Sequence, residues 1–593
     1  MKKVPFYDLT VTDGFWAERQ KTMAEKTVYA VYNRFNETGR IETMDCKPHA
    51  IKPHIFWGSD VVKWMEGAAY ILEQREDPRL RALVEELLDR IEEGVAEDGY
   101  YNSYYNSPDP GKERFSDRND HELYSLGHLI EAAVALSHIG NDRLLKIACK
   151  NADLVDRIFR EEDSAAFTTP GHEEIELALV RLWEATGEKR YLELSEFFVR
   201  KRGCSPKDHA IYKKDNGSGI QSHMPMMEQT TAEGHAVRAV YLYSAVADLA
   251  MVLEDAELKK LAERLFDDIC EKKMYITGGI GSSDRGERFT VPYHLPNREA
   301  YAETCAALGF ALFARRMYQI EPDSRYGDAA ERALFNGMIS GLSLEGDAFF
   351  YSNPLEIDCS YANIPMGYQP ALERKKVFGC SCCPPNLTRL IPSVADFIYT
   401  YDDERLFVHQ YIPNRGTADG YAVEMETAYP SDGYVKISCS GKKLALRKPG
   451  WCTEVRTHAS YTEKKGYLYF ETNEVEIEFV MKPVFYRTGT AVHDNIGRVA
   501  LMRGPIVYCI ESKDQPMRIF QCRVDAEAAV EVSEETYGGY PVLIARGEVS
   551  PFEKGLYIPY KAQERTPCAL RYIPYYTFAN RGADDMQVWV LRK

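Results

Sequence analysis

Pairs of amphipathic helical segments recur along the first two thirds of this 593-residue chain. In the stretch 60–74, apolar residues recur at helical spacing and form one broad face. A short break at 76–78 ends on a proline, which costs no hydrogen bond at the start of the next helix. Similar pairs begin near residues 121, 173, 229 and 301, and a last helix is predicted over about 385–401.

The connections between these segments alternate in length. Turns inside the pairs are short, whereas the links between pairs are long, at about 97–120, 202–228, 273–300 and 342–384. Long loops in a compact domain are commonly functional. The pairs start at positions too unevenly spaced for a solenoid of the tetratricopeptide type. We therefore predict a toroid of six helical hairpins, with all the long loops and the functional site at one end.

After residue 402 the pattern changes to short strands. Segments such as 421–427 and 475–480 alternate or run as strands between turns rich in Gly, Asp and Asn, which is typical of a β-sandwich. A further strand-rich segment follows. The sequence predicts a multidomain α+β protein with an extended segment at 1–14, a helical catalytic domain at 15–401, a β-sandwich at 402–502 and a second β-rich domain at 503–593.

Charge and composition exclude several classes of partner. A net charge of −17 argues against nucleic-acid phosphates, which need a basic face. The 39 tyrosines offer flat apolar faces with polar tips, which suit sugar surfaces as well as sandwich cores. No signal peptide is visible, and the most apolar helix is interrupted by Asp248, so we expect no membrane partner. Cysteines without disulfide spacing predict a reducing cytoplasm.

Three cysteines fall within four residues, at Cys380, Cys382 and Cys383. Thiolate is both a strong nucleophile and a favoured zinc ligand. Upstream, Glu303 and Cys305 form a Glu-x-Cys pair, which together with the adjacent Cys-Cys pair supplies four ligands, enough for one zinc. The alternative is that these thiols are ordinary small core residues.

Glu287 lies on a glycine-rich loop at 276–289. The glycines permit a tight backbone beside a ligand, but the loop lacks the residues and context of a phosphate loop. Alone, Glu287 is typical of a solvated surface charge. Beside a thiolate nucleophile it becomes a candidate general acid, as a retaining glycosidase requires.

Several histidines and tyrosines are predicted near the same end as the long loops. Each histidine by itself is more typical of a structural residue, and each tyrosine of packing. As a set they suit the hydroxyls and the ring face of a sugar. The histidines of this set are His121, His128, His172 and His235, and the tyrosines, which could form aromatic walls, are Tyr100, Tyr101, Tyr104, Tyr105 and Tyr351.

Several motifs together resemble glycoside hydrolase family 127, the bacterial β-L-arabinofuranosidases, and the likeness spans nearly the whole chain. The motifs are Gly-Gly-Ile-Gly-Ser at 278–282, Gly-Glu-Arg-Phe at 286–289, Tyr-Ala-Glu-Thr-Cys at 301–305, Cys-Cys-Pro-Pro-Asn at 382–386 and Arg-Gly-Pro-Ile-Val-Tyr-Cys at 503–509. The resemblance implies an (α/α)6 barrel followed by C-terminal β-sandwich domains, with the N-terminal segment joining a sandwich. It also implies a retaining exo-glycosidase that releases terminal β-L-arabinofuranose.

By the same resemblance, Cys382 is the nucleophile and Glu287 the acid/base. Zn²⁺ is held by Glu303, Cys305, Cys382 and Cys383, and the sugar is contacted by His121, His172, His235 and Tyr351. The expected partner is a small-molecule sugar. The sequence leaves the oligomeric state open, with a homodimer as one alternative. The sequence departs from the family in carrying the extra thiol of Cys380 and a short C-terminal end.

Other functions stay open at this point. A relative of the same type acting on another furanose or on a branched acidic sugar fits the same motifs. A non-catalytic sugar-binding protein with a closed structural zinc is the alternative from another class, because four protein ligands are normally the structural signature. Glu287 distinguishes them, since a structural zinc does not require it. A lyase or an inverting glycosidase on the same toroid would need a carboxylate pair or a Tyr/His base instead.

Overall fold

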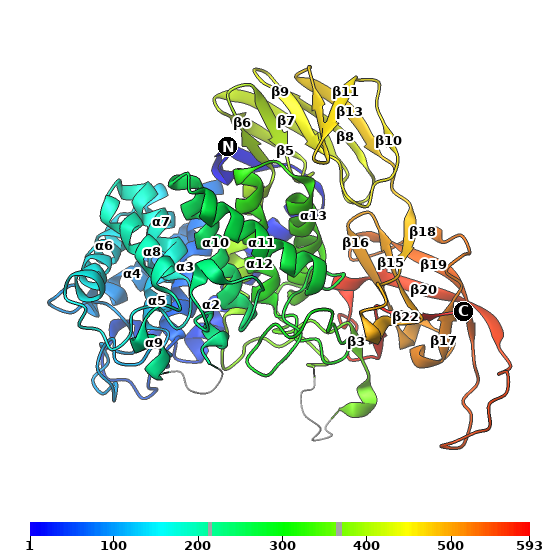
Figure 1. Cartoon of the computed structure of the whole chain (residues 1–593), viewed down its shortest axis with the longest axis horizontal. Coiled ribbons are helices and arrows are strands. Elements are labelled where there is room, and N and C mark those ends of the chain that lie inside the picture. Colours follow the sequence, from blue (N-terminus) through cyan, green and yellow to red (C-terminus); the bar gives the residue numbers. More distant parts are fainter. Residues whose placement is uncertain (212–215, 363–369) are drawn as a thin grey trace.

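The computed structural model describes residues 1–211, 216–362 and 370–593. A helical region, coloured blue to green, lies beside sheet-rich regions coloured yellow to red (Figure 1). The predicted multidomain α+β class is confirmed. No helix among the described residues is long and apolar enough to cross a bilayer.

The helical region contains paired helices at the predicted places. Their bounds are α1 Gly14–Thr22, α2 Val28–Glu37, α3 Trp57–Gln74, α4 Pro78–Glu93, α5 Glu122–His138, α6 Arg143–Asp156, α7 Ile175–Thr186, α8 Lys189–Lys201, α9 Pro206–Ile211, α10 Ala236–Val252, α11 Ala256–Lys272, α12 Thr304–Ile320, α13 Ser324–Arg332 and α14 Cys383–Leu390. Asp77 caps α4 by accepting from Leu80 N–H, with Pro78 at the first helical position, as the break in the sequence predicted.

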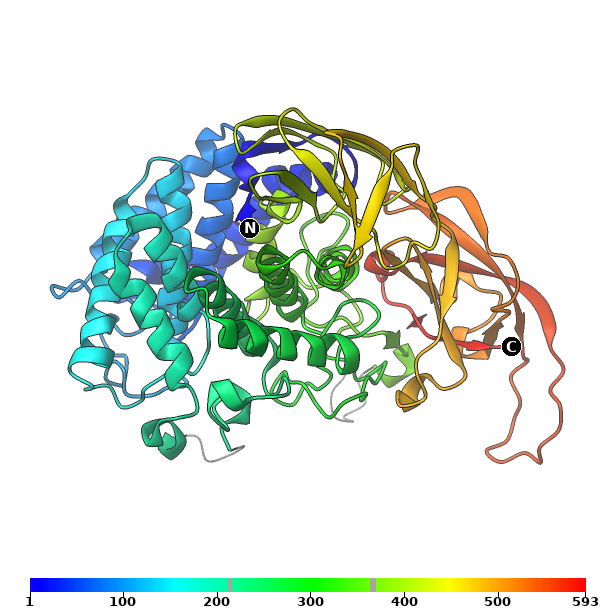
Figure 2. The ribbon, with the colours of Figure 1, turned by 45° about the horizontal axis from the view of Figure 1, so that its top comes forward.

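Alternate helices form a closed inner ring. Each helix in the series α3, α5, α7, α10, α12 and α14 contacts the next, and α14 contacts α3. The inner helices are buried on nearly every side, as α10 shows, whereas their partners such as α11 bury one stripe. Figure 2 shows the ring turned toward the viewer, with the start and the end of the helical region side by side. The ring therefore closes because α14, late in the chain, packs against both α12 and α3.

Two predicted helices are shorter than the sequence pattern suggested. The helix expected from 229 begins only at Ala236, because Gly234 takes a left-handed φ of +75° and the preceding residues form a loop. The helix expected over 385–401 ends at Leu390, close to Pro392, which disfavours helical geometry in the residue before it. The residues 399–401 form a strand instead.

The strands of two six-stranded sheets follow the helical region, and each sheet takes one strand from the N-terminus. The first has the order β1-β4-β5-β9-β12-β11 and the second β10-β13-β8-β7-β6-β2. Their bounds are β1 Lys2–Lys3, β2 Leu9–Val11, β4 Tyr399–Tyr401, β5 Arg405–Val408, β6 Asn414–Ala418, β7 Tyr421–Thr427, β8 Tyr434–Cys439, β9 Lys443–Arg447, β10 Val455–Arg456, β11 Tyr461–Lys464, β12 Tyr467–Phe470 and β13 Glu474–Phe479.

A ten-stranded sheet ends the chain, with the order β14-β15-β22-β17-β19-β20-β16-β21-β3 and β18 paired to β19. Its strands are β3 Glu356–Ile357, β14 Pro483–Tyr486, β15 Arg498–Arg503, β16 Ile506–Glu511, β17 Cys522–Val524, β18 Glu531–Tyr537, β19 Tyr540–Val549, β20 Thr566–Pro574, β21 Met586–Gln587 and β22 Val590–Arg592. Because β14 and β15 belong to it, this sheet begins before residue 503, where the sequence pattern placed the start of a second β-rich domain.

Candidate functional site

The predicted site residues lie at the N-terminal ends of the inner helices. The residue directly before the first residue of the helix is His121 for α5, His235 for α10, Glu303 for α12 and Cys382 for α14. Ring closure turns these four helix starts toward one end of the toroid, the end at which the long loops enter. Helix N-termini carry unpaired N–H groups and partial positive charge, so they favour carboxylates and thiolates.

Four side chains form a compact cluster of metal-ligand type. The Sγ of Cys305 lies 3.4 Å from that of Cys382 and 3.2 Å from that of Cys383, and the last two are 3.8 Å apart. Oε1 of Glu303 lies 3.6 Å from Cys382 Sγ and 3.7 Å from Cys383 Sγ. A tetrahedral zinc site with bonds of roughly 2.0–2.3 Å has edges of roughly 3.3–3.8 Å between its ligands. The spacing of the four donors therefore fits one tetrahedral cation.

The electrostatics of the cluster also fit a cation. Glu303 is 2% exposed, and its Oε2 has no hydrogen-bond partner among the described residues. Burial raises the pKa of Glu303, and the nearby charge of Cys382 raises it further. Burial likewise raises the pKa of Cys383. Four anionic groups so close together repel one another, and a divalent cation at their centre removes that repulsion.

Glu287 lies beside this cluster in a backbone conformation that is rare for a side-chain-bearing residue, with φ +52°. The N–H of Ala236 donates to its carbonyl over 2.9 Å, which ties the glycine-rich loop to the start of α10. Ligand atoms of Glu287, His235 and Glu303 all lie within 4.8 Å of one another. The loop thus places a carboxylate beside Glu303, one of the four donors of the cluster.

Two donors hold the Glu287 carboxylate. Its Oε2 lies 2.7 Å from Nε2 of His235, and its Oε1 accepts from the hydroxyl of Tyr301 over 2.8 Å. Burial raises the pKa of Glu287, but the hydrogen bond and the positive charge that His235 can supply, the hydrogen bond from Tyr301 and the charge of Arg238 together outweigh it and lower the pKa to about 2. Burial lowers the pKa of His235 as well, so a neutral imidazole donates to an ionised carboxylate.

The three predicted histidines form a row across the same end. The ring centres of His121 and His172 are 5.2 Å apart, and those of His172 and His235 are 5.6 Å apart. Nδ1 of His121 lies 2.9 Å from the carbonyl of Asn119, and Nδ1 of His172 lies 3.1 Å from that of Glu173. A carbonyl partner assigns the proton to Nδ1, so Nε2 of both rings is an acceptor.

Burial keeps the imidazoles of this row neutral. It lowers the pKa of His121 to about 3 and that of His172 well below its ordinary range. Neutral rings of this kind suit sugar hydroxyls better than phosphates or carboxylates. His128 differs from them, because it is completely buried with its Nδ1 3.0 Å from Glu174. It belongs to the interior of the ring.

Tyr351 joins the thiols rather than standing apart as an aromatic wall. Cys382 Sγ lies 3.3 Å from its hydroxyl, and Cys380 Sγ lies 3.7 Å from it. The backbone explains the position, because Thr304 N–H donates to the carbonyl of Tyr351 over 2.9 Å. Cys380 contacts Tyr351 but is not part of the four-donor cluster.

Two further residues contact the site and a third lies near it, and none of the three was singled out in the sequence. Tyr301 donates to Glu287, Asn386 donates to Cys305, and the completely buried Lys63 donates to the hydroxyl of Tyr124. Tyr301 and Asn386 belong to the two motifs that carry the cluster, and a lysine inside the apolar face of 60–74 is itself an anomaly. These signals were available, but only the fold shows what each side chain touches.

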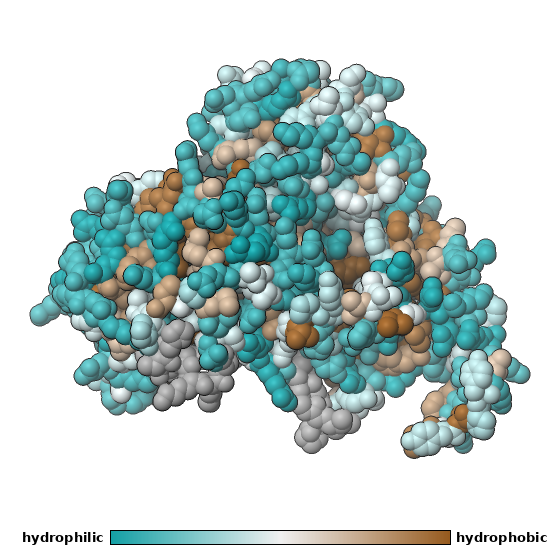
Figure 3. Space-filling view, in the orientation of Figure 1, coloured by the Kyte–Doolittle hydropathy of each residue, from teal (hydrophilic) through white to brown (hydrophobic). Residues whose placement is uncertain are grey.

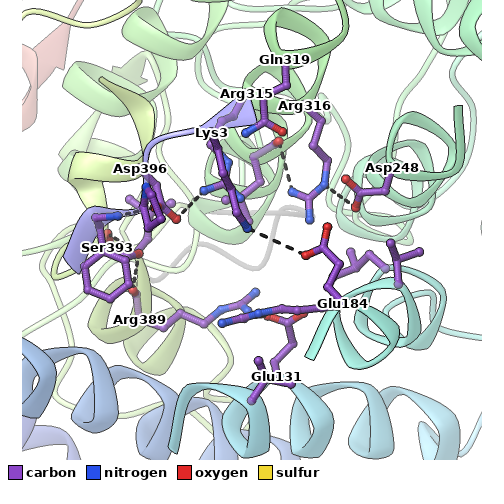
Figure 4. Close-up of a pocket in the computed structure, with 18 of the residues that line it drawn as sticks. Lys3, Glu131, Glu184, Asp248, Arg315, Arg316, Gln319, Arg389, Ser393 and Asp396 are labelled. Atoms are coloured by element: carbon purple, nitrogen blue, oxygen red, sulfur yellow. Dashed lines mark hydrogen bonds and ion pairs between the residues drawn. The ribbon is translucent and has the colours of Figure 1, made fainter. Parts of the chain in front are cut away.

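A separate cavity of about 590 Å³ lies toward the opposite ends of the inner helices. Figure 4 shows it lined by ion pairs. Arg315 pairs with Asp396 at 2.6 Å, and Arg316 pairs with Asp248 at 2.7 Å. Neither the thiols nor Glu287 line it. The cavity is therefore separate from the cluster of thiols and from Glu287.

Known proteins share this architecture over the full chain. The non-reducing end β-L-arabinofuranosidase of Bifidobacterium longum subsp. longum is 35% identical over an alignment of 664 positions, gaps included, that covers 99% of this chain and 100% of that protein. A crystal structure of a β-L-arabinofuranosidase from Geobacillus stearothermophilus T6 is 36% identical with a TM-score of 0.92, covering 99% of this chain and 100% of that chain. A solved β-arabinofuranosidase is 32% identical with a TM-score of 0.90, covering 100% and 98%.

Two family descriptions match the sequence. "Beta-L-arabinofuranosidase, GH127 catalytic domain" matches residues 8–396, which include the ring and every candidate site residue. "Glycoside hydrolase family 127 C-terminal domain" matches residues 483–591, which cover the ten-stranded sheet except β3 and the last residue of β22. Because these matches and the full-length relatives agree with one another, the chain belongs to glycoside hydrolase family 127.

Proposed function

We propose that the protein is a retaining exo-glycosidase that releases terminal β-L-arabinofuranose from arabino-oligosaccharides or glycoconjugates. The observation that carries the proposal is the position of Glu287 beside the Cys/Glu cluster, at the end of the ring where the neutral histidines lie. Relatives named β-L-arabinofuranosidases, similar over the full chain, support the choice of sugar.

The proposed architecture is an (α/α)6 barrel with C-terminal β-sandwiches. Support for the barrel comes from the closed contact series of six inner helices. Support for the first sandwich comes from contacts between β13 and β9, which belong to different six-stranded sheets, and from the alternation of buried and exposed residues along β13. The N-terminal strands β1 and β2 pair with β4 and β6, one in each of these sheets.

The proposed cofactor is Zn²⁺, held by Glu303, Cys305, Cys382 and Cys383. The spacing of these donors, their burial and the unpartnered oxygen of Glu303 fit this ion. When bound, zinc keeps the thiols ionised and lowers the energy of a departing thiolate. The expected content is about one zinc per chain, and active protein without zinc would contradict the assignment.

In the proposed first step, Cys382 acts as the nucleophile. It is the half-buried thiol of the cluster, whereas Cys305 and Cys383 are buried. Its thiolate forms a C–S bond with the anomeric carbon while the glycosidic C–O bond breaks. Glu287 gives its proton to the leaving oxygen, so that a thioglycosyl intermediate and a carboxylate result.

In the proposed second step, the Glu287 carboxylate takes a proton from water, and the water oxygen bonds to the anomeric carbon as the C–S bond breaks. Two inversions at that carbon give net retention. The low pKa of Glu287 in the free site suits this step. The first step needs the protonated form, which a sugar would favour by drawing the His235 donor from the carboxylate to one of its own hydroxyls.

His121, His172, His235 and Tyr351 are the proposed sugar contacts. Tyr351 also lies within reach of the proposed nucleophile, so it is placed to act near the ring oxygen or a hydroxyl next to the anomeric carbon. A pocket formed at one end of the ring binds a single terminal residue, which gives exo action. Internal cuts in an arabinan chain would contradict this reading.

A screen of 4-nitrophenyl furanosides and pyranosides, with added and with chelated zinc, tests the function. The expected result is zinc-dependent hydrolysis of the β-L-arabinofuranoside. Preference for another furanoside would support glycosidase activity but change the assigned sugar. Sugar binding without turnover of any substrate would favour the alternative, a binding protein with structural zinc.

We also propose a cytoplasmic homodimer. Fourteen free cysteines support a reducing compartment. The support for a dimer is an arm at 550–565, between β19 and β20, that extends away from the body (Figure 1). Its apolar residues are strongly exposed, namely Phe552 at 81%, Leu556 at 88%, Tyr557 at 91% and Tyr560 at 99%. Figure 3 shows pale and brown surface on this arm, which a second copy would cover.

A further inference from the structure

Asn386 lies one turn along α14 from the two adjacent cysteines, and its amide contacts a third thiol of the cluster. Its Nδ2 lies 3.1 Å from Sγ of Cys305, which belongs to α12. The side chain of Asn386 is completely buried. The contact is therefore a shielded hydrogen bond from an amide to sulfur, and it joins the two helices that carry the thiols.

The orientation of this amide is determined by its other end. Oδ1 of Asn386 accepts from Nε of Arg389 over 2.8 Å. A guanidinium only donates, so the carbonyl end must face Arg389 and the NH2 end must face Cys305. Sγ of Cys305 therefore accepts a hydrogen bond from the NH2 group of Asn386 and does not face its carbonyl oxygen.

Arg389 is in turn held by two other inner helices. Its Nη1 lies 3.1 Å from Oε2 of Glu66 on α3, and its Nη2 donates to the hydroxyl of Tyr241 on α10 over 3.1 Å. Glu66 also accepts from Tyr70 over 2.7 Å. Arg389 reaches the ion-paired cavity at the opposite end of the ring, where Figure 4 labels it. The side chain that orients the Asn386 amide is therefore itself held in place by hydrogen bonds to α3 and α10.

The three thiols of the cluster consequently have different surroundings. Cys305 accepts from a fixed amide. Cys383 is buried, and its Sγ has the carbonyl of Tyr351 at 4.0 Å. Cys382 is half-buried, and its Sγ lies beside the hydroxyl of Tyr351 at 3.3 Å. The amide of Asn386 therefore restrains Cys305, a thiol that has to stay in place in the proposed mechanism.

We propose that Asn386 is a positioning residue for Cys305, held in place by Arg389. The inference rests on the metal centre proposed above. Three thiolates, one carboxylate and a divalent cation leave two negative charges in a buried place, which is costly without compensation. The amide donor and the buried guanidinium behind it supply that compensation. Contacts of this kind orient metal ligands and tune their donor strength. Cys305 stays in place while Cys382 forms and breaks its bond to the sugar.

The test is zinc affinity, measured by competition with a chelator, in the full-length protein. Asn386→Asp keeps the shape but presents a carboxylate oxygen to the sulfur. The expected result is zinc binding weaker on the order of 10–100-fold. In the Co²⁺-loaded protein, the thiolate charge-transfer absorption should shift as well, because one thiolate loses its donor. This spectroscopic readout does not depend on turnover.

Two matched variants separate this role from general effects of packing. Asn151 is also buried, and its Nδ2 donates to the carbonyl of Tyr101 over 2.9 Å, far from the thiols in the sequence and on another helix. Asn151→Asp should leave zinc affinity unchanged. Thr388→Val removes a buried hydroxyl on the same helix that donates to the carbonyl of Pro385 over 2.7 Å, so affinity and spectrum should stay close to wild type.

The outcomes distinguish the two levels of the proposal. If the wild-type protein does not bind zinc, the metal centre itself fails. If wild type binds zinc and Asn386→Asp binds it equally well with the same cobalt spectrum, the positioning role is overturned. If Asn386→Asp does not fold, Arg389→Lys decides. This substitution keeps the positive charge but removes the guanidinium whose Nε orients the Asn386 amide. A folded Arg389→Lys variant with unchanged zinc affinity would therefore also overturn the positioning role.

Discussion

Nε2 of His235 lies 2.7 Å from Oε2 of Glu287, across 52 residues of sequence. His235 directly precedes an inner helix, and Glu287 lies on a glycine-rich loop whose backbone returns to the start of the same helix. This contact joins a neutral imidazole to the carboxylate that we propose as acid and base. The neighbouring thiols then complete a site in which proton transfer and nucleophilic attack come from separate groups.

If Glu287 is the acid/base, Glu287→Gln should lower activity without changing zinc content. Hydrolysis of a natural glycoside should slow on the order of 10²–10⁴-fold, because the amide cannot protonate the leaving oxygen. Substrates with good leaving groups should recover the first step but not hydrolysis of the intermediate. Zinc content, measured by metal analysis, should stay at the wild-type level. Full activity on a natural glycoside would remove Glu287 from the mechanism.

The nucleophile is predicted to be Cys382 rather than its neighbours. Cys382→Ser should abolish turnover, because a hydroxyl does not match a thiolate as nucleophile. Cys380→Ser is the matched control and should remain active, since Cys380 lies outside the four-donor cluster. Mass spectrometry of Glu287→Gln with an activated substrate should place the sugar adduct on Cys382. An adduct on Cys383 or Cys380 would show that the assignment is wrong.

His235 is predicted to set the pH dependence of the first step. Burial is the largest influence on the Glu287 pKa and raises it, so removal of the opposing donor in His235→Phe should raise that pKa. The acid is active when protonated, and the alkaline limb of kcat/KM should therefore move to higher pH. His138→Phe, at the other end of α5, should leave the limb in place. A limb that moves to lower pH, or not at all, contradicts the coupling.

Glu122 predicts a pH dependence of stability next to His121. Burial raises its pKa from 4.5 to about 7, and its carboxylate accepts from Phe115 N–H over 2.7 Å. The folded state binds this proton more tightly than the unfolded state, so stability falls as pH rises from about 4.5 to about 7.

The matching measurement is the free energy of unfolding across that pH range. Wild type should lose on the order of 3 kcal/mol relative to Glu122→Gln, which mimics the protonated acid at every pH. The exposed Glu18→Gln should instead follow the wild-type curve. Parallel curves for wild type and Glu122→Gln would show that burial does not perturb this group.

The arm predicts the assembly. Wild-type protein should sediment as a dimer, and the pair Tyr557→Ser and Tyr560→Ser should give a monomer, because these rings are 91% and 99% exposed in a single chain. Val291→Ser removes a residue that is 69% exposed elsewhere and should leave the dimer intact. A wild-type monomer at all concentrations, or a dimer that survives the double substitution, rejects the arm as the interface.

Local patterns in the sequence predicted much of the fold. The helical spacing of 60–74 and its repeats predicted paired helices, and the strand alternation of 475–480 predicted sheets, because both depend on a few neighbouring residues. Family membership was also predictable, since Glu303, Cys305, Cys382 and Cys383 stand in distinctive motifs. Proline and glycine effects shifted boundaries, as the late start of α10 after Gly234 shows.

The geometry of the site was decided by the tertiary structure. Residue types predicted four metal donors, but the 3.2 Å between Cys305 and Cys383 depends on closure of the ring, which brings α14 against α3 and α12. The same closure places Asn386 on the sulfur of Cys305. Neither contact leaves a periodic signal in the sequence, because each joins segments about 80 residues apart through packing of whole helices.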